Sequence, residues 1–161
     1  MATYQLRCEM LVNRSIDEVF SVFENPYNLV KITPPSLNFR VTNPATVEMR
    51  QGAEINYTLR VKGLPVKWTT RITDYTPPFH FVDQQFSGPY TLWHHLHTFE
   101  QTVDGVLVKD AVNYILPFGA LGRIVHPIVR KDLLAIFTYR QNALAEMWGG
   151  AKITAPVITL L

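Results

Sequence analysis

Three histidines lie within the stretch WHHLHTFE, which runs from Trp93 to Glu100. Side chains alternate between the two faces of a strand, so His95 and His97 would share one face while His94 takes the other. Two imidazoles on one face can bind a metal ion, move protons near neutral pH, or donate hydrogen bonds that orient a ligand. They can also be structural, as part of a polar network that fixes the curvature of a sheet. Each role needs further groups beside the histidines.

A metal site requires a third ligand, because two imidazoles alone do not complete a coordination shell. The candidates are Asp83, Asp110 and His126, and the sequence spacing places none of them beside the histidine pair. The imidazoles would also need partners that fix their orientation. We therefore predict no metal and no other cofactor, a prediction that the metal content of purified protein would test.

Catalysis without a metal is a second alternative. His95 or His97 could act as the acid or base of a cyclase or dehydratase, and a tyrosine such as Tyr57 or Tyr114 could stabilise the oxyanion. The sequence has no nucleophile motif, glycine-rich phosphate loop or paired-carboxylate signature. Whether the protein is an enzyme stays open, and no other residue is assigned a catalytic role.

Length and composition indicate one globular domain. The chain has 161 residues, of which 47% are hydrophobic and 17% charged, with a net charge of +2. No apolar run has the length of a membrane span, and the scattered basic residues do not favour nucleic acid. The amino terminus lacks the pattern of a secretion signal, so we expect a soluble, cytoplasmic protein. The single cysteine, Cys8, allows no internal disulfide and predicts no particular oligomeric state.

The first part of the chain predicts a strand followed by two short helices. Residues 4–12 alternate between apolar and polar types, which is typical of a strand with one buried face. Ser15 and Glu18 form a capping box that opens the first helix. Asn25 and Pro26 open a second, which we expect to reach Ile32 before the following prolines stop it. The next region is a meander of about six strands with the runs NFRVTN, EINYTLRV, VKWTTRITDY, FHFVDQQF, YTLWHHLHTFEQ and VLVKDAVNYIL.

After Gly119 the apolar residues recur with the period of a helix. Pro127 removes a backbone donor, so it either kinks one helix or begins a second; we expect the long helix to run from about Pro127 to about Gly149. The tail after Gly149 shows no helical stripe, and we expect it to be mobile unless something docks it.

Turn residues predict the register of two hairpins. A turn at Asp104-Gly105 would place Val103 opposite Val106, His97 opposite Val112 and His95 opposite Tyr114. In the preceding hairpin, Val61 would face Val66. Large aromatic and polar side chains would then share one concave face, where unpaired polar groups would each cost roughly 1–3 kcal/mol. This favours a ligand cavity over a solid core. The predicted walls are Tyr57, Leu59, Trp68, Trp93, Tyr114, Ile136 and Phe137, with His95, His97 and Thr70 as polar contacts.

The order of strand, two short helices, curved antiparallel sheet and long carboxy-terminal helix resembles the START-like, or SRPBCC, helix-grip superfamily. The segments PPFHFVDQQFSGPYTLWHHLHTF and KDAVNYILPFGALGRIVHPIV are similar to its small bacterial ligand-binding proteins of the polyketide cyclase/dehydrase-like kind. The shared pattern is FVD, GPY, W-x-H-x-H-x-F and D-x-V-x-Y-x-LPFG-x-LG, matched here at Phe81 to Asp83, Gly88 to Tyr90, Trp93, His95, His97, Phe99, Asp110, Val112, Tyr114, Leu116 to Gly119, and Leu121-Gly122.

The resemblance implies an α+β helix-grip domain over residues 1–148, in which a seven-stranded sheet wraps the long helix, followed by a tail over residues 149–161. It also implies a hydrophobic cavity between sheet and helix, but no particular reaction. We therefore expect the protein to bind a small, largely hydrophobic molecule such as a lipid, isoprenoid or aromatic polyketide. A polyketide cyclase or dehydratase is the alternative. A protein-interaction module, in which the apolar tail contacts a neighbour, is the third.

Overall fold

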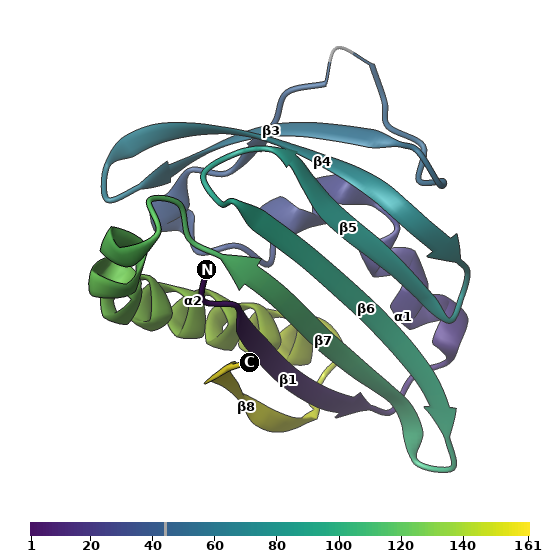
Figure 1. Ribbon diagram of the computed structural model, residues 1–161. Coiled ribbons are helices and arrows are strands. Elements are labelled where there is room, and N and C mark those ends of the chain that lie inside the picture. Colours follow the sequence, from purple (N-terminus) through teal and green to yellow (C-terminus); the bar gives the residue numbers. More distant parts are fainter. Residues whose placement is uncertain (44) are drawn as a thin grey trace.

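The computed structural model describes residues 1–43 and 45–161 and has the α+β helix-grip fold. One antiparallel sheet of eight strands, in the order β2-β3-β4-β5-β6-β7-β1-β8, curves around the long helix α2 (Figure 1). The strands are β1 (Tyr4–Val12), β2 (Arg40–Val41), β3 (Glu54–Val61), β4 (Leu64–Thr76), β5 (His80–Ser87), β6 (Leu92–Thr102), β7 (Gly105–Ile115) and β8 (Lys152–Leu160). The helices are α1 (Ile16–Phe23), α2 (Ala120–Met147) and the 3-10 helices η1 (Pro26–Val30) and η2 (Pro35–Leu37).

The helices after β1 close one end of the sheet. Ser15 accepts a hydrogen bond from the Glu18 amide, and Glu18 accepts one from the Ser15 amide, so the expected capping box begins α1. The second short helix is the 3-10 helix η1, which ends at Val30 and does not reach Ile32. Pro35 does not merely stop the chain, because it begins the further 3-10 turn η2.

The predicted registers of both hairpins are wrong by two residues. Thr102 pairs with Gly105 and Val61 with Leu64, so the tight turns are Val103-Asp104 and Lys62-Gly63. His97 therefore lies opposite Asp110, and His95 lies opposite Val112. A shift of two residues leaves every side chain on its predicted face, because the period of a strand is two. His95 and His97 thus point to the concave side, as the alternation of the sequence predicts.

Helix α2 begins earlier than predicted, at Ala120, and contains Pro127. The residues just before it, Phe118 and Gly119, have positive φ angles of 67° and 54°, which end the extended chain after β7. No helix among the described residues is both long and apolar enough to cross a membrane.

The tail, expected to be mobile unless docked, forms the eighth strand. β8 pairs with β1 in antiparallel fashion, and the pairing is interrupted between Arg7 and Glu9. Pro156 falls within this irregularity, where a residue without an N–H group can be accommodated. The two termini therefore lie close together, and the Leu161 amide donates to the Thr3 carbonyl at 2.9 Å (Figure 1).

The buried side chains form two hydrophobic clusters. One lies at the α1 end and includes Phe20, Phe99 and Trp148. The other lies toward the start of α2 and includes Trp93 and Phe137. His97 stacks on Phe81 of the first cluster, with ring centroids 4.3 Å apart, whereas His95 lies 5.6 Å from Phe137 of the second. The histidine pair therefore occupies the boundary between them.

Candidate functional site

A cavity of about 950 Å³ lies between the concave face of the sheet and α2. Its lining comes from β3, β4, β5 and β6 on one side and from α2 on the other, with the η1 and η2 region and the turns after Gly88 and Leu116 around them. Most of the lining side chains are aliphatic or aromatic. A shallower hollow of about 400 Å³ lies along residues 43–54, but none of the histidines borders it.

All of the predicted cavity residues except Tyr114 border this cavity. They are Tyr57, Leu59, Trp68, Thr70, Trp93, His95, His97, Ile136 and Phe137. Tyr114 is fully buried behind the wall, where it stacks on Tyr4 and its hydroxyl lies 3.0 Å from Nε2 of His126. The predicted register placed Tyr114 opposite His95, and the true register places it opposite Trp93.

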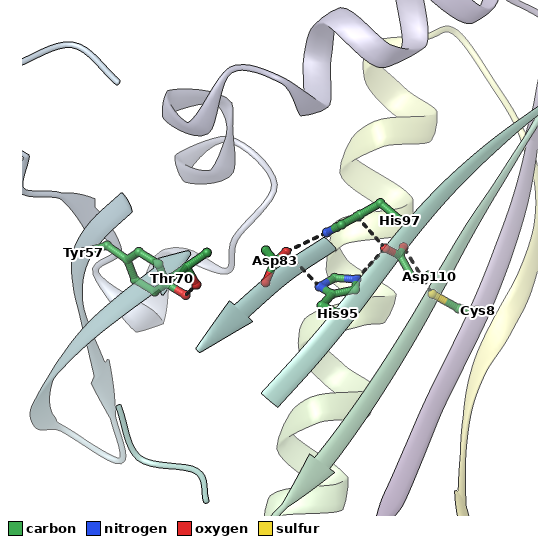
Figure 2. A network of polar contacts seen from close by, with 7 residues as sticks. All are labelled: Cys8, Tyr57, Thr70, Asp83, His95, His97 and Asp110. Carbon is green, nitrogen blue, oxygen red and sulfur yellow. Dashed lines mark hydrogen bonds and ion pairs between the residues drawn. The ribbon is translucent and has the colours of Figure 1, made fainter. Parts of the chain in front are cut away.

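Two carboxylates enclose the histidine pair on the concave face (Figure 2). Nε2 of His95 donates to Oδ1 of Asp110 at 2.7 Å, and Nε2 of His97 donates to Oδ2 of Asp83 at 2.7 Å. The remaining nitrogens cross over, with Nδ1 of His95 at 3.4 Å from Asp83 and Nδ1 of His97 at 3.0 Å from Asp110. The latter contact is close but poorly aligned, so His97 Nδ1 has no proper hydrogen bond. The thiol of Cys8 contacts the other oxygen of Asp110 at 3.7 Å.

Burial and the carboxylates shift the pKa values of the two histidines in opposite directions. Burial lowers the pKa of His95, and the charge of His97 lowers it further. Burial also opposes the charged form of His97, but the close carboxylates of Asp110 and Asp83 outweigh it and raise the His97 pKa. Of the two imidazoles, His97 therefore takes up a proton more readily than His95.

The two carboxylates remain ionised for a related reason. Burial would raise the pKa of Asp110, but the N–H groups of His95 and His97 hold it well below its usual range. For Asp83, burial raises the pKa, while the two imidazoles and, more weakly, Arg140 bring it below the ordinary value. Asp110 is enclosed, whereas the Asp83 side chain is 20% exposed and reaches the cavity. Asp83 is thus the charged member of the network that a ligand can contact.

The same residues could hold a metal ion. One ligand atom from each of Asp83, His95 and His97 lies within 4.8 Å of the others, and Asp110 would orient both rings from behind. The chemistry of two imidazoles and a carboxylate fits a zinc-like cation with an open position toward the cavity. Of the three candidate third ligands, Asp83 and Asp110 lie at the histidine pair. His126 does not, since it stacks on Tyr4 with ring centroids 3.5 Å apart.

The other histidines lie outside the cavity. His94 faces the opposite side of the sheet, as predicted, but it is half-buried and its Nδ1 atom has no partner among the described residues. His80 begins β5 and lies 3.0 Å from Asp74.

Sequence reasoning named only part of the cavity lining, and among the residues it missed is the charged side chain Arg140. A signal for it existed, because Arg140 follows Ile136 by four residues and Phe137 by three, which places it on the same face of a helix. The network role of Asp83 was also missed, although the sequence had named Asp83 as a possible metal ligand. The contact follows from the register of β5 with β6, which places Asp83 opposite His95 and which the sequence analysis did not assign.

The fold is shared with solved structures of low sequence identity. Protein CV1439 from Chromobacterium violaceum superposes with a TM-score of 0.68 at 12% identity, over 89% of this chain and 96% of that one. Protein Ms6760 from Mycobacterium smegmatis gives a TM-score of 0.65 at 14% identity, over 89% of each chain. Ginseng major latex-like protein 151 from Panax ginseng gives a TM-score of 0.64 at 10% identity, over 92% of this chain and 99% of that one. No protein-family model and no curated protein matches the sequence.

Proposed function

We propose that this protein binds a small, largely hydrophobic molecule, such as a lipid, isoprenoid or aromatic polyketide, in the cavity between the sheet and α2. The observation that carries the proposal is the cavity itself, whose volume of about 950 Å³ lies within the usual range for ligand sites. Aromatic walls such as Trp68 and Trp93 suit apolar rings or chains. A site with a few polar groups in an otherwise apolar lining is the usual composition of such a pocket.

The polar end of the ligand would lie near the polar network of His95, His97, Asp83 and Asp110. Direct bonds to the histidines are limited, because both Nε2 atoms already bond a carboxylate at 2.7 Å and both Nδ1 atoms lie within 3.4 Å of the same two carboxylates. Tyr57 and Thr70, whose hydroxyl oxygens lie 3.4 Å apart, border the same cavity and offer further hydrogen-bonding groups. Burial raises the pKa of Tyr57, so its hydroxyl stays protonated and can donate.

The structural similarity to two bacterial proteins and to a plant latex-like protein supports the proposal, because it indicates a fold that can enclose such a cavity. The finer assignment, to the small bacterial ligand-binding subgroup of the START-like superfamily, rests on the sequence motifs and is part of the proposal. So is the division into a ligand-binding domain over residues 1–148 and a tail.

A matched pair of tryptophan substitutions tests the proposal. Ile136 lines the cavity, so Ile136→Trp should fill part of it. Ile124 lies on the same helix, is 72% exposed and does not border the cavity, so Ile124→Trp is the control. Native mass spectrometry of gently purified protein should show a co-purified mass that persists in Ile124→Trp and is lost in Ile136→Trp. An empty wild type with no thermal shift across a lipid and polyketide panel would refute the proposal.

A cyclase or dehydratase is the second candidate, favoured by the pairing of His97 with the partly exposed Asp83. An imidazolium beside a carboxylate at a cavity surface can pass protons to and from a bound polyketone. Turnover of a polyketone that is lost in His97→Gln, while the bound mass is retained, would support this activity. Retained turnover in that variant would exclude His97 as its acid or base.

A further inference from the structure

Arg140 projects from α2 into the lining of the cavity. Its guanidinium carbon lies 4.8 Å from the centre of the Phe137 ring, so the aromatic face supports part of the side chain. An arginine cannot lose its charge in a protein, and a charge in an apolar cavity is unfavourable unless an opposite charge or hydrogen bonds accompany it.

Among the described residues, the charge of Asp83 is near enough to be felt by Arg140, but no group makes a direct contact with the guanidinium. Its Nε atom is buried and has no hydrogen bond. None of the ion pairs within 4.0 Å among the described residues includes Arg140. The two carboxylates of the polar network are not free to turn toward it, since Asp83 and Asp110 are held by the histidines. Arg140 therefore presents unused N–H groups to the cavity.

A second unused donor lies on the opposite wall. Nε1 of Trp68 is buried without a hydrogen bond, and Trp68 borders the same cavity. Indole and guanidinium nitrogens only donate hydrogen bonds. Nε of Arg140 and Nε1 of Trp68 therefore both lack an acceptor. Leaving a buried donor unpaired is unfavourable. A hydroxyl oxygen could accept from one of these donors, but it lacks the two oxygens and the negative charge with which a carboxylate can accept from a guanidinium.

We propose that Arg140 anchors an acidic group, a carboxylate, of an amphipathic ligand whose apolar body fills the cavity. This inference rests on the proposed binding function and names the chemical class of the ligand. A planar guanidinium matches a carboxylate with two parallel hydrogen bonds, which a neutral alcohol of the same length cannot reproduce. The ligand class is therefore an amphipathic acid rather than a neutral sterol or hydrocarbon.

The test compares dodecanoate with dodecanol, two ligands that differ in their polar end. Each displaces a neutral fluorescent probe, N-phenyl-1-naphthylamine, from the full-length protein at pH 7.5. The wild type should bind the acid about ten- to a hundredfold more tightly than the alcohol. R140Q should lose that preference while its affinity for the alcohol changes less than about twofold. R130Q, an exposed position on the same helix outside the cavity lining, should behave as the wild type.

The outcomes separate this inference from the binding function. Equal affinity of the wild type for acid and alcohol, or an unchanged preference in R140Q, would overturn the anchor and leave the cavity as a ligand site. Failure of the probe and both ligands to bind the wild type would overturn both. If circular dichroism shows that R140Q is unfolded, R140K replaces it in the test. Lysine keeps the positive charge but not the paired N–H groups of the guanidinium, so R140K should keep a reduced preference for the acid.

Discussion

Asp110 is the side chain on which the polar network depends. Its two oxygens meet Cys8 of β1 and both histidines of β6, so three neighbouring strands are linked through one carboxylate. Burial raises the pKa of the Cys8 thiol, and the charge of Asp110 raises it further, so the thiol stays protonated and can donate weakly. A buried carboxylate with these partners stabilises the fold as long as it is ionised, whereas removal of one member leaves the others unpaired.

Asp110→Asn should lower the free energy of unfolding by about 2–4 kcal/mol at pH 7 because it removes the charge that both imidazoles bond. The Asp110 pKa is depressed in the folded state, so its contribution is present above the ordinary value near 4 and is lost as the pH falls through the folded value. The difference in free energy of unfolding between wild type and variant, measured with urea, should therefore become smaller as the pH falls below about 4. Asp104→Asn, in the exposed β6–β7 turn, is the control. A difference in free energy of unfolding that did not change with pH would contradict a stabilising role for the ionised Asp110 carboxylate.

At the scale of elements, Gly105 fixes the β6–β7 hairpin against the end of β1. Gly105 has a φ of 129°, and a Cβ atom there would overlap the carbonyl oxygen of Val12. The turn thus combines a conformation that favours glycine with a close approach of two backbones.

Gly105→Ala should lower the free energy of unfolding by about 2–4 kcal/mol, because backbone strain adds to steric overlap. Gly63→Ala is the matched control, since Gly63 has a φ of 81° but no neighbouring atom within 4 Å of the place that a Cβ atom would take. The control should lose only about 1 kcal/mol, the cost of the left-handed conformation. Chemical unfolding of the two variants measures the difference. Equal losses would show that the contact with Val12 is relieved by movement of the backbone.

The elements show which parts of the site a sequence can predict. Periodicity assigned His95, His97, Trp68 and Trp93 to the concave face, because a face depends only on the parity of a residue's position in its strand. Register depends on which two residues form the turn, and the dipeptide Asp104-Gly105 was misleading because Gly105 adopts its positive φ as the first residue of β7 and not within the turn. The contact of His97 with Asp83 depends on the register of β5 with β6, which are joined by residues 88–91 rather than by a two-residue turn. It could not be derived from local patterns.

The same distinction explains the end of the chain. Ile153, Thr154, Val157, Ile158 and Thr159 have the branched side chains that favour strands, so a signal for β8 was present. Two glycines and Pro156 obscured it. A strand at a sheet edge is stabilised by its partner, here β1, and the sequence of the tail alone does not identify that partner.

At the scale of the whole molecule, the cavity and the tail occupy different parts of the fold. The cavity opens between α2 and the β3 to β6 side of the sheet, whereas β8 lies beside β1 at the opposite edge (Figure 1). Gln141 of α2 connects the helix to that edge, because its Nε2 donates to the carbonyl oxygens of Glu9 and Thr154 at 3.0 Å each. The tail therefore covers the edge of β1 and does not border the cavity.

Truncation after Ala151 should cause the protein to self-associate. Without β8, the backbone N–H and C=O groups along β1 that now pair with β8 become an open edge, which can pair with the same edge of another chain. The truncated protein should show a higher molar mass than the full-length chain by light scattering after size exclusion, increasing with concentration. Deletion of Leu161 alone leaves Lys152–Leu160 intact and is the control. An unchanged mass would contradict the role of β8 as an edge cover, and a smaller mass would instead indicate that the tail itself joins two copies of the chain, as expected of an interaction module.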